Sequence, residues 1–347
     1  MATRLHVASI KGVWTLKSDD SRTWELEHES LGGWTIPKLA VSSSRPNLIL
    51  AGTRGDGVWV SEDFGKKWRK PSYGKRGPGK VRSVMTDPRD PNIVYAGTEP
   101  IDLFVSHDLA KNWRRVKSLW DIPSVPSIVY PVNVVEPHVR DIAIDPINTA
   151  TIYAALQVGF MAKSTDAGES WKLLDNGLDA DVHTIVIDSQ SPTSLFAATG
   201  GHQYRSGHSP GRALYRSVDG GDNWLPTAMD FPHDYSVPLV MHPLRSNILF
   251  AGLAKGHPGF WRDRPAKAES VIIKTADSGR TWQQLDGKAS GLNQDFPEAL
   301  AIDSKDPNRV YAALKSGNVY RSEDSGNTWE SLGIKVPEVT DMKCVND

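Results

Sequence analysis

At six spaced positions of the chain, a serine or threonine stands two residues before an aspartate and seven before a tryptophan, and such a pair could supply a hydroxyl and a carboxylate to a reaction. Each pair opens an eight-residue pattern that ends in tryptophan and, in five copies, has glycine at the fifth position. The same pair can accept backbone N–H groups in a tight turn, where glycine supplies a positive φ. Because scattered copies cannot form one active site, we interpret them as structural turns, with aspartates Asp63, Asp108, Asp166, Asp219, Asp277 and Asp324.

The pattern belongs to a longer repeat. A seventh, degraded copy at Lys17–Trp24 has Lys17 in place of the first serine and Ser21 in place of glycine, and successive tryptophans are 44 to 58 residues apart. About halfway between copies, a turn rich in Asp and Pro precedes a β-branched and aromatic strand that ends in Ala-Gly or Ala-Ala, as in Asp87–Gly97. This spacing is typical of four-stranded propeller blades.

The sequence therefore predicts one all-β domain over residues 1–347, a seven-bladed β-propeller with four antiparallel strands in each blade. The chain starts with strand-like segments Leu5–Ser9 and Gly12–Thr15 and ends with a lone one, Val339–Val345. We expect the last segment to complete the first blade and close the ring, because closure leaves no open sheet edge. No amphipathic helix with capping signals is found. The predicted blades are 339–345 with 4–27, 36–71, 81–117, 139–174, 182–226, 236–285 and 297–332.

The eight-residue pattern resembles the Asp box, or BNR repeat, of sialidases, sortilin-type receptors, xyloglucan-cleaving glycosidases and photosystem II assembly factors. The resemblance covers essentially the whole chain and implies a propeller whose boxes lie on turns away from the ligand face. It implies little about function, because function depends on the site and not on the fold. The Arg-Ile-Pro motif of sialidases is absent, so their arginine triad is not carried over. In the xyloglucan-cleaving enzymes two propellers face one cleft, whereas the repeats of this chain are enough for a single propeller.

The innermost strand of each blade starts beside the channel mouth, and in four blades its second residue is ionisable. Arginines around a channel suit a carboxylate, phosphate or sulfate. The candidate substrate-binding residues at this position are Arg82, Arg140 and His183, and Glu298 is a candidate acid or base. His138 and Glu136 precede Arg140, and we add them to the binding and acid/base candidates respectively.

Long loops are expected on the same face over blades four to six, and long loops on a rigid scaffold are usually functional. Their aromatic residues could stack on a sugar or another flat ligand; the alternative is that they only pack their own loops. The binding candidates from these loops are Trp120, Tyr204, Arg205 and Trp261, and Asp234 is a third candidate acid or base.

Two functions fit these features. The first is ligand binding or glycosidase-like hydrolysis of an anionic or carbohydrate-like small molecule at the channel mouth. The alternative is a non-catalytic protein-interaction or assembly scaffold, helped by the basic segment Lys66–Arg82. We favour the first, because a scaffold would not need three aromatic-rich insertions on one side.

Composition narrows the partners. A net charge of −1 and a pI near 6.8 lack the basic footprint of nucleic-acid binding. Cys344 is the one cysteine, no signal-peptide pattern starts the chain, and no apolar run spans a membrane, so we expect a soluble cytoplasmic protein. No cofactor is required by the sequence. A divalent metal held by His and Glu is the less favoured alternative, because no His-Glu-x-x-His spacing occurs.

Overall fold

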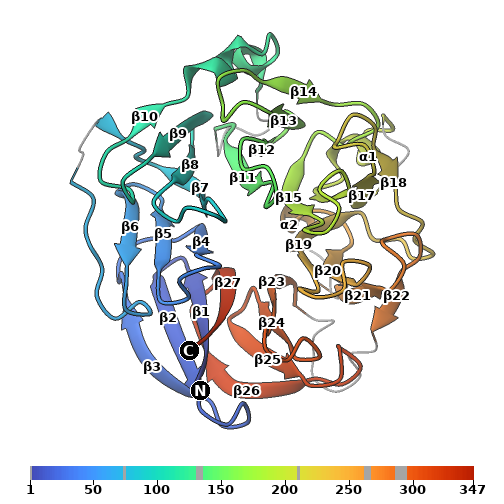
Figure 1. Cartoon of the computed structure of the whole chain (residues 1–347). Coiled ribbons are helices and arrows are strands. Elements are labelled where there is room, and N and C mark those ends of the chain that lie inside the picture. The colour runs from blue at the N-terminus through green and yellow to red at the C-terminus, as the bar shows by residue number, and fades with distance from the viewer. Residues whose placement is uncertain (1, 73–75, 130–135, 209–211, 262–266, 286–294) are drawn as a thin grey trace.

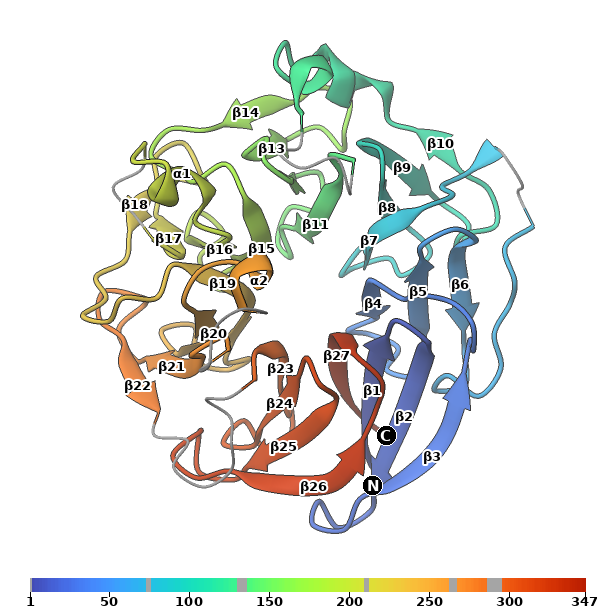
Figure 2. The same cartoon turned by 180° about the vertical axis from the view of Figure 1, so that it is seen from behind.

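The computed structural model describes residues 2–72, 76–129, 136–208, 212–261, 267–285 and 295–347. Over these residues, seven antiparallel sheets surround a central channel, each running outward from it as one blade (Figures 1 and 2). The predicted seven-bladed propeller is confirmed.

The first blade contains both ends of the chain, as predicted. Its order from the channel outward is β27 (Val339–Asn346), β1 (Thr3–Ser9), β2 (Gly12–Ser18) and β3 (Glu25–Ser30). β27 pairs with β1 from Thr3 opposite Asn346 to Ser9 opposite Val339, so the ring is closed by ordinary backbone hydrogen bonds. Figure 1 shows the two termini side by side.

The other six blades follow in chain order. The second holds β4 (Lys38–Val41), β5 (Ile49–Thr53) and β6 (Gly57–Ser61), and in place of a fourth strand Arg69 forms a bridge with Val60. The third blade holds β7 (Val81–Thr86), β8 (Val94–Thr98), β9 (Asp102–Ser106) and β10 (Arg114–Arg115), and the fourth holds β11 (Val139–Ile144), β12 (Ile152–Leu156), β13 (Met161–Ser164) and β14 (Lys172–Leu174). The fifth holds β15 (Val182–Ile187), β16 (Leu195–Thr199), β17 (Leu214–Ser217) and β18 (Leu225–Pro226), and the sixth holds β19 (Tyr235–Met241), β20 (Leu249–Ala254), β21 (Val271–Thr275) and β22 (Gln283–Leu285). The seventh holds β23 (Pro297–Ile302), β24 (Val310–Leu314), β25 (Asn318–Ser322) and β26 (Glu330–Lys335).

The second strand of each blade is buried along its whole length, because neighbouring blades cover both of its faces. The small residues that end these strands allow the close approach of the next blade. A Cβ atom on Gly97 would lie 2.5 Å from Cβ of Val139, and one on Gly252 would lie 2.6 Å from Cγ of Pro297. The Ala-Gly signature therefore marks the contact between successive blades.

The Asp boxes form the turns after the third strands, as predicted. In the last box, Oγ of Ser322 accepts the N–H of Gly326 at 2.7 Å and donates to Asp324, whose carboxylate accepts the N–H of Thr328 at 2.8 Å. The Trp329 indole donates to the Gly326 carbonyl at 2.9 Å and packs in a core cluster with Phe250 of the sixth blade. Each box therefore fastens its own turn and seals a gap between blades.

The first box differs from the sequence alignment by one residue. Ser18 and Asp20, not Lys17 and Asp19, make the turn: Ser18 donates to Asp20, and Asp20 accepts the N–H groups of Arg22 and Thr23 at 2.8 and 2.7 Å. The degraded box thus keeps a serine and an aspartate two residues apart, but the spacing from its serine to Trp24 is one residue shorter than in the other boxes.

Short helices also occur that the sequence did not indicate. Two 3₁₀ turns, Lys117–Asp121 and Val125–Ser127, lie between the third and fourth blades. α1 (His202–Arg205) and α2 (Pro258–Trp261) lie in the insertions of the fifth and sixth blades. None of the helices in the described residues is long and apolar enough to cross a membrane.

Candidate functional site

A β-bulge at the channel mouth singles out the second residue of the inner strand. In the third blade, Val81 and Ser83 pair with adjacent residues of β8, so Arg82 is the extra residue. The same irregularity isolates Arg140 on β11, His183 on β15, Glu298 on β23 and Thr340 on β27. Bulges re-aim side chains and are common beside active sites. The backbone therefore presents the four ionisable candidates in one repeated geometry.

Arg82 belongs to a chain of polar contacts across three blades. Its Nη1 lies 3.5 Å from the buried carboxylate of Glu99, which also faces Arg54 of the second blade at 3.1 Å. Its Nη2 lies 3.0 Å from Nε2 of His138, which is fully buried. Arg82 and His138, selected separately from the sequence, are thus brought together.

Arg140 is different, because its guanidinium makes no hydrogen bond and no ion pair within the described part of the chain, although it is half-buried. The positive charge of Arg140 nevertheless acts electrostatically on the pKa values of His138, Asp181 and Lys38. Arg140 therefore offers a cation near these three residues with its donors unused.

His183 is held between two acceptors. Its Nδ1 lies 2.7 Å from the carbonyl oxygen of Ser236, and its Nε2 lies 3.3 Å from Oδ1 of Asp181. Burial alone would raise the pKa of Asp181, but His183 and Arg140 outweigh it and hold that pKa below its usual value. A buried carboxylate thus lies beside two of the predicted cationic residues.

The insertions over the fifth and sixth blades are tied to each other. Arg205 of α1 pairs with Asp234 at 3.0 Å, and the other carboxylate oxygen of Asp234 accepts the N–H of Gly256 at 2.6 Å. The Tyr204 ring is about one-third exposed and lies 5.9 Å from the Arg212 guanidinium. These contacts place Tyr204 and Arg205 together, with Asp234 as the link to the next insertion.

Trp261 and Trp120 pack against the protein. The Trp261 indole donates to the Gly256 carbonyl at 3.1 Å, and its ring packs on Phe296 and Tyr235, beside the channel where both views place α2 (Figures 1 and 2). Trp120 lies 5.9 Å from the Arg115 guanidinium on β10, the strand of its blade farthest from the channel. The structure therefore does not bring Trp120 to the other candidates.

The three candidate acids or bases are each paired with a cation. Glu298 lies 3.5 Å from Lys315, and Glu136, more than half exposed, lies 3.8 Å from Lys80. Asp234 is held by Arg205 as described. Among the described residues, no group of three or more His, Cys, Asp or Glu side chains is arranged to hold a metal ion.

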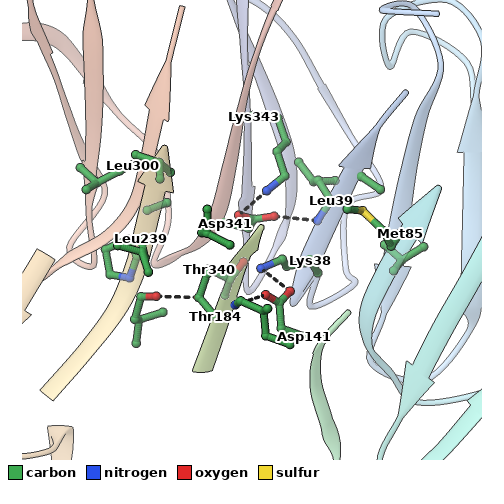
Figure 3. A pocket seen from close by; sticks show the side chains of 18 of the residues that line it. Lys38, Leu39, Met85, Asp141, Thr184, Leu239, Leu300, Thr340, Asp341 and Lys343 are labelled. Carbon is green, nitrogen blue, oxygen red and sulfur yellow. Dashed lines mark hydrogen bonds and ion pairs between the residues drawn. The ribbon is translucent and has the colours of Figure 1, made fainter. Parts of the chain in front are cut away.

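The channel beneath the mouth forms a cavity of about 310 Å³ that all seven inner strands line (Figure 3). Of its five charged residues, sequence reasoning selected Glu298 and missed the other four. Lys38 of the second blade and Asp141 of the fourth pair at 3.1 Å, and Asp341 and Lys343 of β27 pair at 3.1 Å. The available signal was the charge at Asp141 and Asp341, each directly after a bulged residue.

Comparisons with known proteins agree with this architecture. A family model described as the BNR-Asp box repeat matches residues 58–70. The xyloglucanase of Hypocrea jecorina is 21% identical over 220 residues, which cover 56% of this chain and 26% of that enzyme. A xyloglucanase of a Paenibacillus species is 25% identical over 206 residues, which cover 52% of this chain and 20% of the enzyme. The matched regions thus span about a quarter or less of these relatives.

Two solved structures show the same fold at low identity. The GH74 xyloglucanase from Xanthomonas campestris superposes with a TM-score of 0.69 at 15% identity, covering 94% of this chain and 52% of the enzyme. A structure described as YCF48 bound to D1 peptide gives a TM-score of 0.57 at 16% identity, covering 86% of this chain and 82% of that one. The chain is therefore similar to propellers of both kinds.

Proposed function

We propose that this chain binds an anionic small molecule at the channel mouth, with Arg140 as the residue that receives the anionic group. The observation that carries the proposal is the contrast among the bulged residues. Arg82, His183 and Glu298 are engaged with protein partners, whereas Arg140 has none in the described residues. A guanidinium with unused donors in a partly desolvated site binds carboxylate or phosphate strongly and with defined geometry.

Binding has more support than hydrolysis. A glycosidase of the usual kind needs two carboxyl groups flanking the bond, about 5 to 10 Å apart. Glu136 precedes the fourth blade, Asp234 precedes the sixth and Glu298 lies on the seventh, and each is paired with its own cation. The distant similarity to xyloglucanases leaves hydrolysis of a glycoside as an activity to be assayed on the same purified protein.

The direct test is titration calorimetry with inorganic phosphate, acetate and glucuronate as probes. The Arg140→Gln variant should weaken binding of the best probe at least tenfold, because a charge-assisted, two-pronged contact is lost. Arg280→Gln is the matched control, since Arg280 is exposed in the Asp-box turn of the sixth blade. Equal affinities in the native protein and Arg140→Gln would refute the proposed role of Arg140.

A protein-binding scaffold is the second candidate, and one observation favours it. The match to YCF48 bound to D1 peptide covers 82% of that chain, so it compares one propeller with one propeller. On the present chain, Arg76 and Lys80 lie exposed in the segment that leads into β7. If this face binds a peptide, reversing both charges to glutamate should abolish capture of an acidic partner while Arg280→Glu does not. Unchanged capture would remove the basic segment from the proposal.

A further inference from the structure

The channel wall is mainly apolar. Of the 21 residues that line the cavity, 14 are Ala, Val, Leu, Ile, Met or Pro, including Leu39, Met85 and Leu300 in Figure 3. Its volume of about 310 Å³ is at the lower end of the range for small-molecule sites. The channel thus has room for a small body, and apolar residues form the majority of those around it.

The polar residues in this wall are already paired. Lys38 pairs with Asp141, whose second oxygen accepts the Ile185 N–H at 2.9 Å. Lys343 pairs with Asp341, whose second oxygen accepts the Leu39 N–H at 2.9 Å (Figure 3).

The remaining polar side chains of the wall also have protein partners. The hydroxyls of Thr184 and Thr340 donate to backbone carbonyls of the next blade at 2.7 and 2.5 Å, and Glu298 faces Lys315. A polar ligand body would have to compete with these contacts for the same side chains, and giving up a buried hydrogen bond is costly.

The cavity reaches the level of Arg140. Glu298 and Thr340 line it, and both are the bulged second residues of their inner strands, the position that Arg140 occupies on β11. Asp141, the next residue after Arg140, lines the cavity as well. The guanidinium with unused donors therefore lies at the rim of an apolar channel.

We infer that the ligand is a monocarboxylate with an apolar body, whose hydrocarbon part enters the channel while its carboxylate pairs with Arg140. This inference rests on the proposed function and adds a substrate class to it. It disfavours a sugar in the channel, because the hydroxyl groups of a sugar would face a wall in which 14 of 21 residues are apolar. A free small acid and the carboxyl terminus of an apolar peptide share this chemistry.

The test is calorimetric titration with straight-chain acids from acetate to decanoate, each below its micelle concentration, and with the matching alcohols. Affinity should rise about fourfold with each methylene, equivalent to about 0.8 kcal/mol, until the channel is filled, and then level off. Octanoate should bind at least tenfold more tightly than octanol, and Arg140→Gln should abolish that difference while Arg280→Gln preserves it. A short peptide ending in Leu-Leu, with and without C-terminal amidation, distinguishes the two sources of the carboxylate.

Two variants test whether the ligand body lies in the channel. Met85→Ala enlarges the cavity and should shift the plateau to longer acids. Val240→Phe, at a partly exposed residue of the wall, narrows the cavity and should shift the plateau to shorter acids, and urea unfolding of each variant verifies the fold. Affinity for acids that is independent of chain length but sensitive to Arg140→Gln would overturn this inference and leave the proposed function intact. No binding of any acid or phosphate by the native protein would overturn both.

Discussion

Nη2 of Arg82 lies 3.0 Å from Nε2 of His138, and this contact joins the third and fourth blades at the channel mouth. Nδ1 of His138 is 2.9 Å from the carbonyl oxygen of Glu136, so Nδ1 carries the proton and Nε2 accepts from the guanidinium. Burial, followed by the charges of Arg82 and Arg140, lowers the pKa of His138 to about 2. The residue is therefore a neutral acceptor that orients Arg82.

The first prediction is that His138 makes the fold less stable as the pH falls below about 6.5. Unfolded histidine binds a proton below that pH, while His138 in the folded chain stays neutral down to about 2. Stability from this group is therefore full above pH 6.5 and is lost progressively toward lower pH. Between pH 7 and 5.5, His138→Gln should lose about 1 kcal/mol less unfolding free energy than the native protein. Urea unfolding at both values measures this.

The control for this comparison is His107→Gln, because His107 is exposed on an Asp-box turn. It should lose as much stability as the native protein. If His138→Gln and the native protein show parallel pH profiles, then His138 is protonated in the folded state and cannot accept from Arg82.

The second prediction concerns the ion pair of Lys38 with Asp141 in the channel wall. Asp141→Ala leaves Lys38 without its anion and the Ile185 N–H without its acceptor, so it should cost about 3 kcal/mol in urea unfolding. Asp141→Asn keeps an acceptor for Ile185 and should cost roughly half as much. A double-mutant cycle with Lys38→Met isolates the pairing energy. Additive costs in that cycle would mean that the two charges do not interact.

The fold was predictable because its signals are local. Ser322, Asp324, Gly326 and Trp329 form one turn from eight consecutive residues, so their spacing alone identifies it. The bulged residues were also within reach, since one alignment position selected Arg82, Arg140, His183 and Glu298. The ion pair of Lys38 with Asp141 was not within reach, because it joins residues about a hundred positions apart that only the arrangement of the blades brings together. Trp120 shows the opposite error: a loop attached to the correct face can fold outward over its own blade.

The third prediction tests the Asp box as a structural turn. Oγ of the buried Ser217 accepts the N–H of Gly221 at 2.9 Å and donates to Asp219 at 2.8 Å. Ser217→Ala leaves that N–H buried without an acceptor and should cost about 1 to 3 kcal/mol in urea unfolding. Ligand affinity at the mouth should not change, because the box lies at the opposite end of the blade. A loss of binding without a loss of stability would show that the box belongs to the ligand site.

The last prediction concerns Gly200, which covers the Asp181–His183 pair. A Cβ atom there would lie 2.0 Å from Oδ2 of Asp181 and 2.9 Å from Cε1 of His183, so the pair would have to move. Gly200→Ala should therefore destabilise the fold by about 1 to 3 kcal/mol, as overpacking usually does. The matched control is Gly79→Ala, where a Cβ meets nothing within 4 Å, and its unfolding free energy should stay within about 0.5 kcal/mol of the native value. Equal stability of the two variants would mean that Asp181 can leave its position beside His183 freely, and the buried pair would then not be a fixed part of the mouth.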